Sequence, residues 1–252
     1  MNATICLFRT VCMGLLVLGG VACTRHFPSG SDGGLTADER ARLDQVRNGE
    51  SPVLSIDLPS QRMLLQQGSR PIAAHTRGLD SLIKVLEQTA RRHGAMGIAS
   101  VQVGIPVRIA LLLRVGPDGS RYFQEYLNPA VVQRSAERIS SLEHCLSVPW
   151  GYRFTSRPRE IKIRYEEAGG GEVVETLRND EAIVFQQEMD HLEGKLLSDG
   201  LSPASFIPPD QISGFAAAVR HDCHRQRLTS MECDDRMRLR WEARTGQKKF
   251  LE

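Results

Sequence analysis

Two segments of the chain place apolar residues at the three- and four-residue spacing of an amphipathic helix. The first covers residues 78–93, and the second begins after a cap at Asn179 or Asp180 and continues to about His191. A glycine follows each segment within three residues, where a helix commonly ends. The spacing therefore predicts two helices far apart in the sequence.

Between these helices the apolar pattern changes to short runs that are typical of β-strands. The segments Pro117–Gly119 and Gly169–Gly171 interrupt the runs and are turn signals. The runs cover residues 107–115, 122–127, 139–148, 161–165 and 172–177. Because the strands cluster between two helices and do not alternate with helices, we expect an α+β domain with antiparallel sheets.

The chain before the first long helix contains one more helix signal. Thr36 and Glu39 have the spacing of a capping box, which predicts a short, charged helix to about Val46. Pro52 and Pro59 lie in a segment that is predicted to be a loop. The expected organisation is a signal peptide over 1–23, a flexible tether over 24–35, a short helix over 36–50, the main domain over 51–201 and a helical extension over 202–252.

The N-terminus has the layout of a secretory signal, with Arg9 before an apolar run, Val11–Val21, that is short for a membrane span. Its end resembles a bacterial lipoprotein signal, in which Cys23 would be lipidated and Thr24 would direct the protein to the outer membrane. We therefore expect export to the bacterial cell envelope and a lipid anchor that leaves the protein facing the periplasm. The alternative is that Cys23 is one more residue of the apolar segment.

Composition narrows the function classes. The chain has 252 residues, 41% hydrophobic and 25% charged, with a net charge of +2 and 6% aromatic residues. These values fit a globular protein and do not indicate a nucleic-acid partner. The basic run Arg236–Arg244 is interpreted as a solvated helix face.

Three cysteines follow the signal and tether: Cys145, Cys223 and Cys233. The last two could form a disulfide in an oxidising compartment, and the sequence leaves this open. The segment His221–His224 is rich in metal-ligand types, but its donors are too close together on one helix to hold one ion. We interpret it as part of a charged helix.

The second long helix carries the first candidate for chemistry. Gln187 and His191 are one helical turn apart, and Glu188 lies beside them. Two histidines at the outer positions would bind a divalent metal ion while the glutamate acted on its bound water. Only His191 can do so here, and such a pair also occurs on ordinary solvent-exposed faces.

Two other segments strengthen this candidate. Cys145 lies in a strand-like run, and a thiolate is a strong ligand for iron or zinc, although a lone buried cysteine is usually inert packing. The segment Gly97–Gly104 is rich in small residues and contains Gln102. Small side chains would let the backbone and the Gln102 amide come close to another group. The alternative is that the segment forms a tight turn for packing.

In this order the three segments resemble the motifs of the peptide deformylases, G-x-G-[LI]-A-[AS]-x-Q, E-G-C-[LI]-S and H-E-x-D-H. The resemblance covers about residues 51–201. It implies antiparallel sheets packed around a central helix that carries the third motif. It also implies metal-dependent hydrolysis of the formyl group of N-formylmethionyl peptides.

Carried over by position, the resemblance assigns Cys145, His191 and the position of Gln187 as ligands of one Fe²⁺ or Zn²⁺ ion. Glu188 would be the general acid and base. Gln102 and the backbone amide of Leu146 would stabilise the oxyanion.

The remaining assignments concern the substrate. Gly97 would offer its backbone to the peptide. Met96, Ile183 and Val184 would line an apolar slot for the methionine side chain, or else belong to the ordinary core.

The chain departs from the family pattern at three positions: Gln187 replaces a histidine, His144 replaces a glycine and Ala95 replaces a glycine. A neutral amide is a poor metal ligand beside a thiolate and an imidazole. His144 is not expected to compensate, because adjacent residues on a strand point to opposite faces.

Two functions remain open at this point. One is a metal hydrolase with a weakened site, acting on N-formylmethionyl or related peptides. The other is an exported module that binds peptide N-termini or an envelope partner without turnover.

Overall fold

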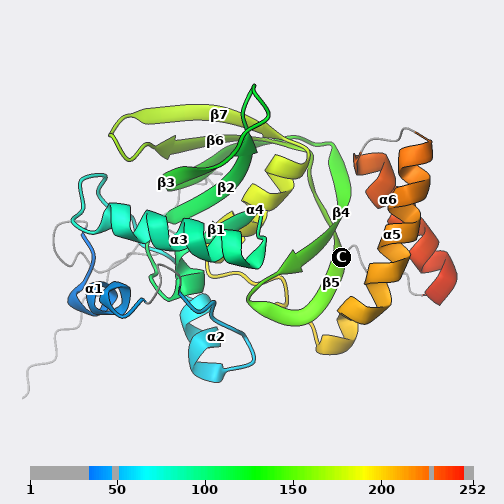
Figure 1. Ribbon diagram of the computed structural model, residues 1–252, viewed down its shortest axis with the longest axis horizontal. Coiled ribbons are helices and arrows are strands. Elements are labelled where there is room, and N and C mark those ends of the chain that lie inside the picture. Colours follow the sequence, from blue (N-terminus) through cyan, green and yellow to red (C-terminus); the bar gives the residue numbers. More distant parts are fainter. Residues whose placement is uncertain (1–33, 47–50, 227–229, 247–252) are drawn as a thin grey trace, which may run out of the picture.

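A computed structural model describes residues 34–46, 51–226 and 230–246 (Figure 1). Its helices are α1 (Ala37–Asp44), α2 (Pro59–Leu65), α3 (Leu79–His93), α4 (Asp180–Leu192), α5 (Pro209–Arg225) and α6 (Ser230–Thr245), with short 3₁₀ turns at Ser100–Val103 and Pro203–Ser205. The predicted signal peptide, Cys23 and most of the predicted tether lie outside the described residues. No helix in the described ranges is both long enough and apolar enough to cross a membrane.

Within the described residues, seven strands form two antiparallel sheets. They are β1 (Gly97–Ala99), β2 (Ile109–Val115), β3 (Arg121–Arg134), β4 (Arg138–Cys145), β5 (Val148–Pro158), β6 (Glu160–Glu166) and β7 (Glu172–Arg178). The larger sheet has the order β1-β2-β3-β6-β7, and β4 pairs with β5 in the smaller one. The expected α+β class with antiparallel sheets is therefore confirmed.

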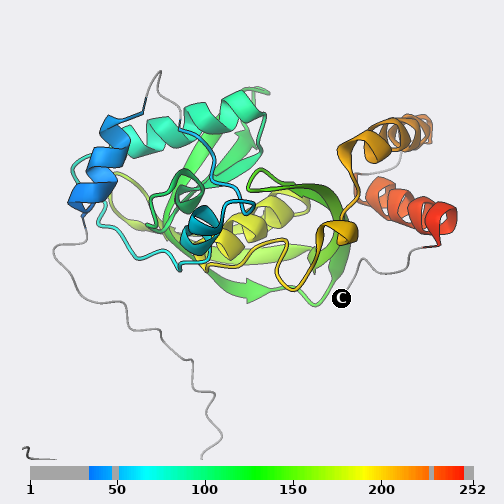
Figure 2. The same ribbon diagram turned by 90° about the horizontal axis from the view of Figure 1, so that it is seen from below.

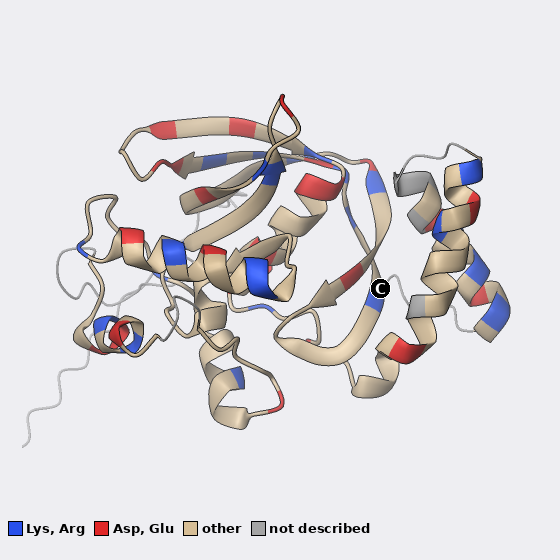
Figure 3. Cartoon of the chain, viewed as in Figure 1, with Lys and Arg blue, Asp and Glu red and all other residues tan. Residues whose placement is uncertain are grey.

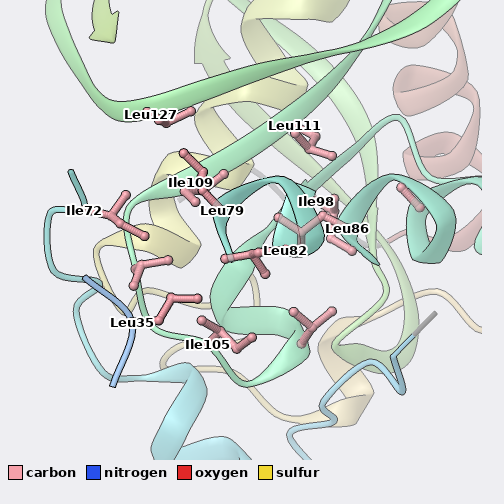
Figure 4. Packing of buried hydrophobic residues seen from close by; sticks show 13 residues of the cluster. Leu35, Ile72, Leu79, Leu82, Leu86, Ile98, Ile105, Ile109, Leu111 and Leu127 are labelled. Carbon is pink, nitrogen blue, oxygen red and sulfur yellow. The ribbon is translucent and has the colours of Figure 1, made fainter. Parts of the chain in front are cut away.

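The first half of strand β2, residues 109–112, is buried on both faces, because helices cover each side of the larger sheet near it. Ile109 and Leu111 pack with the apolar face of α3 (Figure 4), whereas Ala110 and Leu112 pack in the cluster that contains Phe185 of α4. This is the two-residue alternation of a strand, with both sets of side chains apolar. It fixes α4 against the sheet edge formed by β1 and β2.

Three parts of the predicted pattern were wrong. The proline-rich segment contains helix α2, which begins at Pro59, because proline is well suited to the first position of a helix. The run 139–148 is split: β4 ends at Cys145, and a second strand, β5, continues to Pro158. Strand β3 extends to Arg134, well beyond the predicted end, through an irregular step after Leu127.

The C-terminal helices α5 and α6 pack against β4 and β5 (Figure 2). Cys223 of α5 and Cys233 of α6 form a disulfide with a Cα–Cα distance of 5.6 Å. The extension starts from a backbone bridge between Tyr152 and Ile207, where a β-carbon on Gly151 would lie 2.2 Å from the Ile207 carbonyl oxygen. Figure 3 shows Lys and Arg on both of these helices.

Candidate active site

A cavity of about 740 Å³ lies where β1, the end of β4, α4 and α5 meet. Pockets that bind small ligands usually have volumes of about 300–1,000 Å³. All ten cleft residues expected from the sequence line it, namely Met96, Gly97, Gln102, Cys145, Leu146, Ile183, Val184, Gln187, Glu188 and His191. Met96 is 49% exposed, so it is not the ordinary core residue of the alternative interpretation.

Cys145 and His191 meet at the bottom of the cavity. The Sγ of Cys145 lies 3.2 Å from Nε2 of His191, and both side chains are buried. Burial raises the pKa of the Cys145 thiol to about 12, although backbone N–H groups of Ser147 and Val148 act in the opposite direction. The thiol is therefore neutral near pH 7 unless a cation is bound.

Two buried polar atoms in this region lack a hydrogen-bond partner: Nδ1 of His191 and Oε2 of Glu188. Burial lowers the pKa of His191 to about 4 and raises the pKa of Glu188 to about 8. Near pH 7 the imidazole is neutral and the carboxyl mostly holds its proton. Unpaired buried polar atoms are rare in folded proteins and are found where a ligand or a reaction uses them.

Gly97 brings the backbone of β1 against α4. A β-carbon at this position would lie 2.6 Å from Oε1 of Glu188 and 2.7 Å from Cγ1 of Val184. Only glycine allows this approach, which leaves the β1 backbone beside the Glu188 carboxyl at the edge of the cavity.

Both polar atoms of the Gln102 side-chain amide make hydrogen bonds. Its Oε1 accepts a hydrogen bond of 2.8 Å from the Ala99 N–H, and its Nε2 donates to Oγ of Ser147 at 3.3 Å. Gln102 is buried, and Leu146 follows Cys145 in the turn between β4 and β5. The amide group therefore has a fixed orientation close to Cys145.

Gln187 differs from these buried groups. It is half-buried, and its Nε2 donates a 3.4 Å hydrogen bond to the backbone carbonyl of His144. The His144 ring is exposed and stacks on Tyr152 at 4.9 Å, whereas the adjacent Cys145 is buried. The expected opposite orientation of His144 and Cys145 thus agrees with their exposure, although His144 also lines the cavity.

A sequence model of the polypeptide deformylase family matches residues 53–206, which is more than half of the chain. The chain belongs to the peptide deformylase family. A peptide deformylase of Caulobacter vibrioides is 37% identical over 153 residues, which are 60% of this chain and 87% of that protein. One of Thermotoga petrophila is 32% identical over 145 residues, which are 57% and 85% of the two chains.

Solved deformylase structures show the same fold. The Met-Ala-Ser-bound enzyme of Acinetobacter baumannii has a TM-score of 0.53 and 26% identity, over 59% of this chain and 96% of that chain. The enzyme of Thermotoga maritima has a TM-score of 0.54 and 28% identity, over 61% and 99%. About two-fifths of this deformylase-family chain therefore has no counterpart in those structures.

The family uses a divalent metal ion, and this chain offers two strong donors for one. The 3.2 Å between Cys145 Sγ and His191 Nε2 is near the separation of about 3.5 Å expected for tetrahedral sulfur and nitrogen ligands of one zinc ion. Gln187 supplies only a neutral amide. No group of three or more His, Cys, Asp or Glu among the described residues is arranged to hold an ion. The donor set does not fit a complete metal centre.

An ion-pair network behind the cavity was not expected from the sequence. Arg157 of β5 binds Glu143 of β4, with 2.9 Å between Nη2 and Oε2, and Asp190 of α4, with 2.8 Å between Nη1 and Oδ2. It therefore ties the strand that carries Cys145 to the helix that carries His191. Only the pairing of β4 with β5 could have indicated this contact in advance.

The second group that sequence reasoning missed comes from the C-terminal extension. Arg220, Cys223 and His224 of α5 and Cys233 of α6 line the same cavity. The interpretation of residues 221–224 as part of a charged helix agrees with α5, but it did not anticipate that this helix borders the cleft.

Proposed function

We propose that the cleft binds the first residues of N-formylmethionyl peptides and that hydrolysis of the formyl group is strongly impaired. Family membership implies formyl removal from such peptides as the ancestral reaction. The observation that carries the proposal of impairment is the place of Gln187, whose amide donates to the His144 carbonyl beside Cys145 and His191. It gives the protein two strong metal donors where the family pattern provides three.

The remaining groups support binding and proton handling. Met96, Ile183 and Val184 offer an apolar lining to an unbranched side chain, and the fixed Gln102 amide can donate to a carbonyl oxygen. Glu188 can hold a proton next to the β1 backbone at neutral pH, because burial raises its pKa to about 8. These groups are arranged as a binding cleft even if turnover is slow.

The hydrolase reading retains one specific support. The unpaired Oε2 of Glu188 is an atom that a proton transfer at this site would use, and Nε2 of His191 remains beside Sγ of Cys145. An experiment therefore has to measure turnover and metal content together.

The test is hydrolysis of formyl-Met-Ala-Ser by the full-length protein in detergent, loaded anaerobically with Fe²⁺ or Zn²⁺. We expect Gln187→His to exceed the unmodified protein at least 100-fold, because loss of a direct ligand costs more than the ~10–100-fold of an outer-shell partner. Gln187→Ala serves as the matched control and should remain as inactive as the unmodified protein. Adding Glu188→Gln to the histidine variant should abolish the gain.

An unmodified protein that contains one metal per chain and matches the histidine variant would refute impairment. If none of the variants, the histidine variant included, hydrolyses or binds the peptide, the proposal of a peptide-binding cleft also fails.

We further propose that the protein is exported and anchored in the outer membrane through lipidated Cys23. The layout of residues 1–23 supports export, and so does the Cys223–Cys233 disulfide, because disulfides persist mainly in oxidising compartments. Metabolic labelling with palmitate tests the anchor. Label should be present in the unmodified protein and absent from Cys23→Ala, and label that persists in that variant contradicts lipidation.

A further inference from the structure

The cleft has a wall that the family domain does not provide. On one side lie β1, the end of β4 and α4, and on the other lie Arg220, Cys223 and His224 of α5 with Cys233 of α6. The disulfide joins α5 to α6 at the cavity surface, so both helices contribute to one wall. A ligand in the cavity therefore lies between the family domain and these two helices.

The wall is an addition to the shared fold. The family match ends at residue 206, before α5 begins at Pro209. The Acinetobacter baumannii structure with bound Met-Ala-Ser is covered over 96% of its own length by only 59% of this chain. A ligand in this cavity therefore meets side chains that lie outside the family match.

Arg220 is the one arginine or lysine among the cavity-lining residues in the described part of the chain. Its side chain is exposed and makes no hydrogen bond or ion pair with any described residue. Other arginines of these helices differ: Arg225 and Arg240 bind Asp222, and Arg238 binds Glu242. A guanidinium that faces a cavity without a partner is suited to a carboxylate, which it can bind through two parallel hydrogen bonds.

The acids of the cavity leave Arg220 available to a ligand. Glu143 is paired with Arg157, and Glu188 is buried on the opposite side. Asp180, the first residue of α4, has no ion pair with Arg220 in the structure. The guanidinium of Arg220 is therefore paired with none of the acids that line the cavity.

We propose that the α5–α6 wall restricts the cleft to short N-acylated peptides with a free C-terminal carboxylate, which Arg220 binds. This inference rests on the proposed function, since it requires that the acylated N-terminus occupies the cleft near Cys145. It adds a substrate class: small peptide fragments, in place of the N-terminus of a long chain.

The experiment measures dissociation constants by calorimetry with the full-length protein in detergent. The probes are formyl-Met-Ala, its C-terminal amide, and a formylated pentapeptide that begins with the same two residues. We expect the free acid to bind about 10-fold more tightly than the amide and than the pentapeptide. Arg220→Gln should remove the preference for the acid over the amide, and Arg220→Lys should restore part of it.

Arg225→Gln is the matched control, because Arg225 is an exposed arginine of the same helix that does not line the cavity. It should keep the full preference. Equal binding of acid and amide by the unmodified protein, or a preference that survives in Arg220→Gln, overturns the role of Arg220 while leaving peptide binding intact. Tighter binding of the pentapeptide overturns the length limit, and no binding of any probe refutes the proposed function itself.

Discussion

The floor and the mouth of the cleft are built differently. The floor, defined here as Cys145, Glu188 and His191, is buried, and the Arg157 network holds the strand and helix that carry it. The mouth, defined as His144, Gln187, Arg220 and His224, consists of exposed or half-buried side chains.

The difference separates buried groups that match the family motifs from exposed groups that depart from the motifs or lie outside them. A buried floor with unpaired polar atoms is costly to maintain, and it is still present. The mouth has an amide, Gln187, where the family pattern has a histidine, and it includes Arg220 and His224 of the extension. Recognition of a ligand is therefore expected to depend on the mouth, and integrity of the fold on the floor.

The largest expected effect comes from removing the support of the floor. Arg157→Met should lower the free energy of unfolding by about 3–5 kcal/mol, because it leaves buried Glu143 without its charge partner. Urea denaturation measures the change. Arg178→Gln, which breaks the exposed pair with Glu160, is the control and should cost under about 1 kcal/mol. Similar losses in both variants would contradict the distinction between buried support and surface pairing.

A second, somewhat smaller effect concerns pH in the metal-free protein. The pKa of Glu188 is raised from 4.5 to about 8 in the folded state. The protonated Glu188 contributes its full stabilisation below pH 4.5, the pKa of the unfolded state. This contribution is lost as the pH rises through the folded pKa of about 8. Between pH 5 and pH 8 the free energy of unfolding should fall by about 2–4 kcal/mol, and Glu188→Gln should remove this decline.

His191 acts in the opposite direction at lower pH. Its folded pKa is lowered from 6.5 to about 4, so its contribution is complete above pH 6.5 and is lost as the pH falls through about 4. Chemical denaturation across pH 4–8 with a chelator present measures both effects: the loss of stability that Glu188 causes as the pH rises and the loss that His191 causes as the pH falls. A Glu188→Gln protein that retains the loss between pH 5 and pH 8 would show that another group causes it.

The smallest of these effects comes from the contact between β1 and α4. Gly97→Ala should cost about 1–3 kcal/mol, because the added carbon overlaps Glu188 and Val184. Gly169→Ala is the control, since a β-carbon there meets no atom within 4 Å. Equal stability of the two variants would mean that β1 does not approach α4 this closely.

Local signals in the sequence predicted much of the fold. The amphipathic spacing located α3 and α4, and the capping box of Thr36 and Glu39 is present at α1. Strand β5 was missed because Pro149, Gly151 and two arginines interrupt its pattern of apolar residues. Its pairing with β4 depends on the turn after Cys145, which no residue pattern made clear.

The sequence predicted only those site residues that lie in short motifs. Glu188, Gln102 and Cys145 were found because each lies in a short segment with a chemical rationale. Arg157 and Arg220 were not, since their roles depend on contacts between segments far apart in the chain. The motifs record the floor of the cleft together with His144 and Gln187 of its mouth, whereas Arg220 and His224 join the mouth only through the packing of α5.

The affinity for Zn²⁺ or Fe²⁺ tests the central claim most directly. Anaerobic competition titration of the unmodified full-length protein and of Gln187→His gives both dissociation constants. We predict that the histidine variant binds one ion per chain at least 100-fold more tightly, because the floor supplies two donors and lacks only the third. Stoichiometric binding by both proteins with affinities that differ by less than about 3-fold would contradict the account.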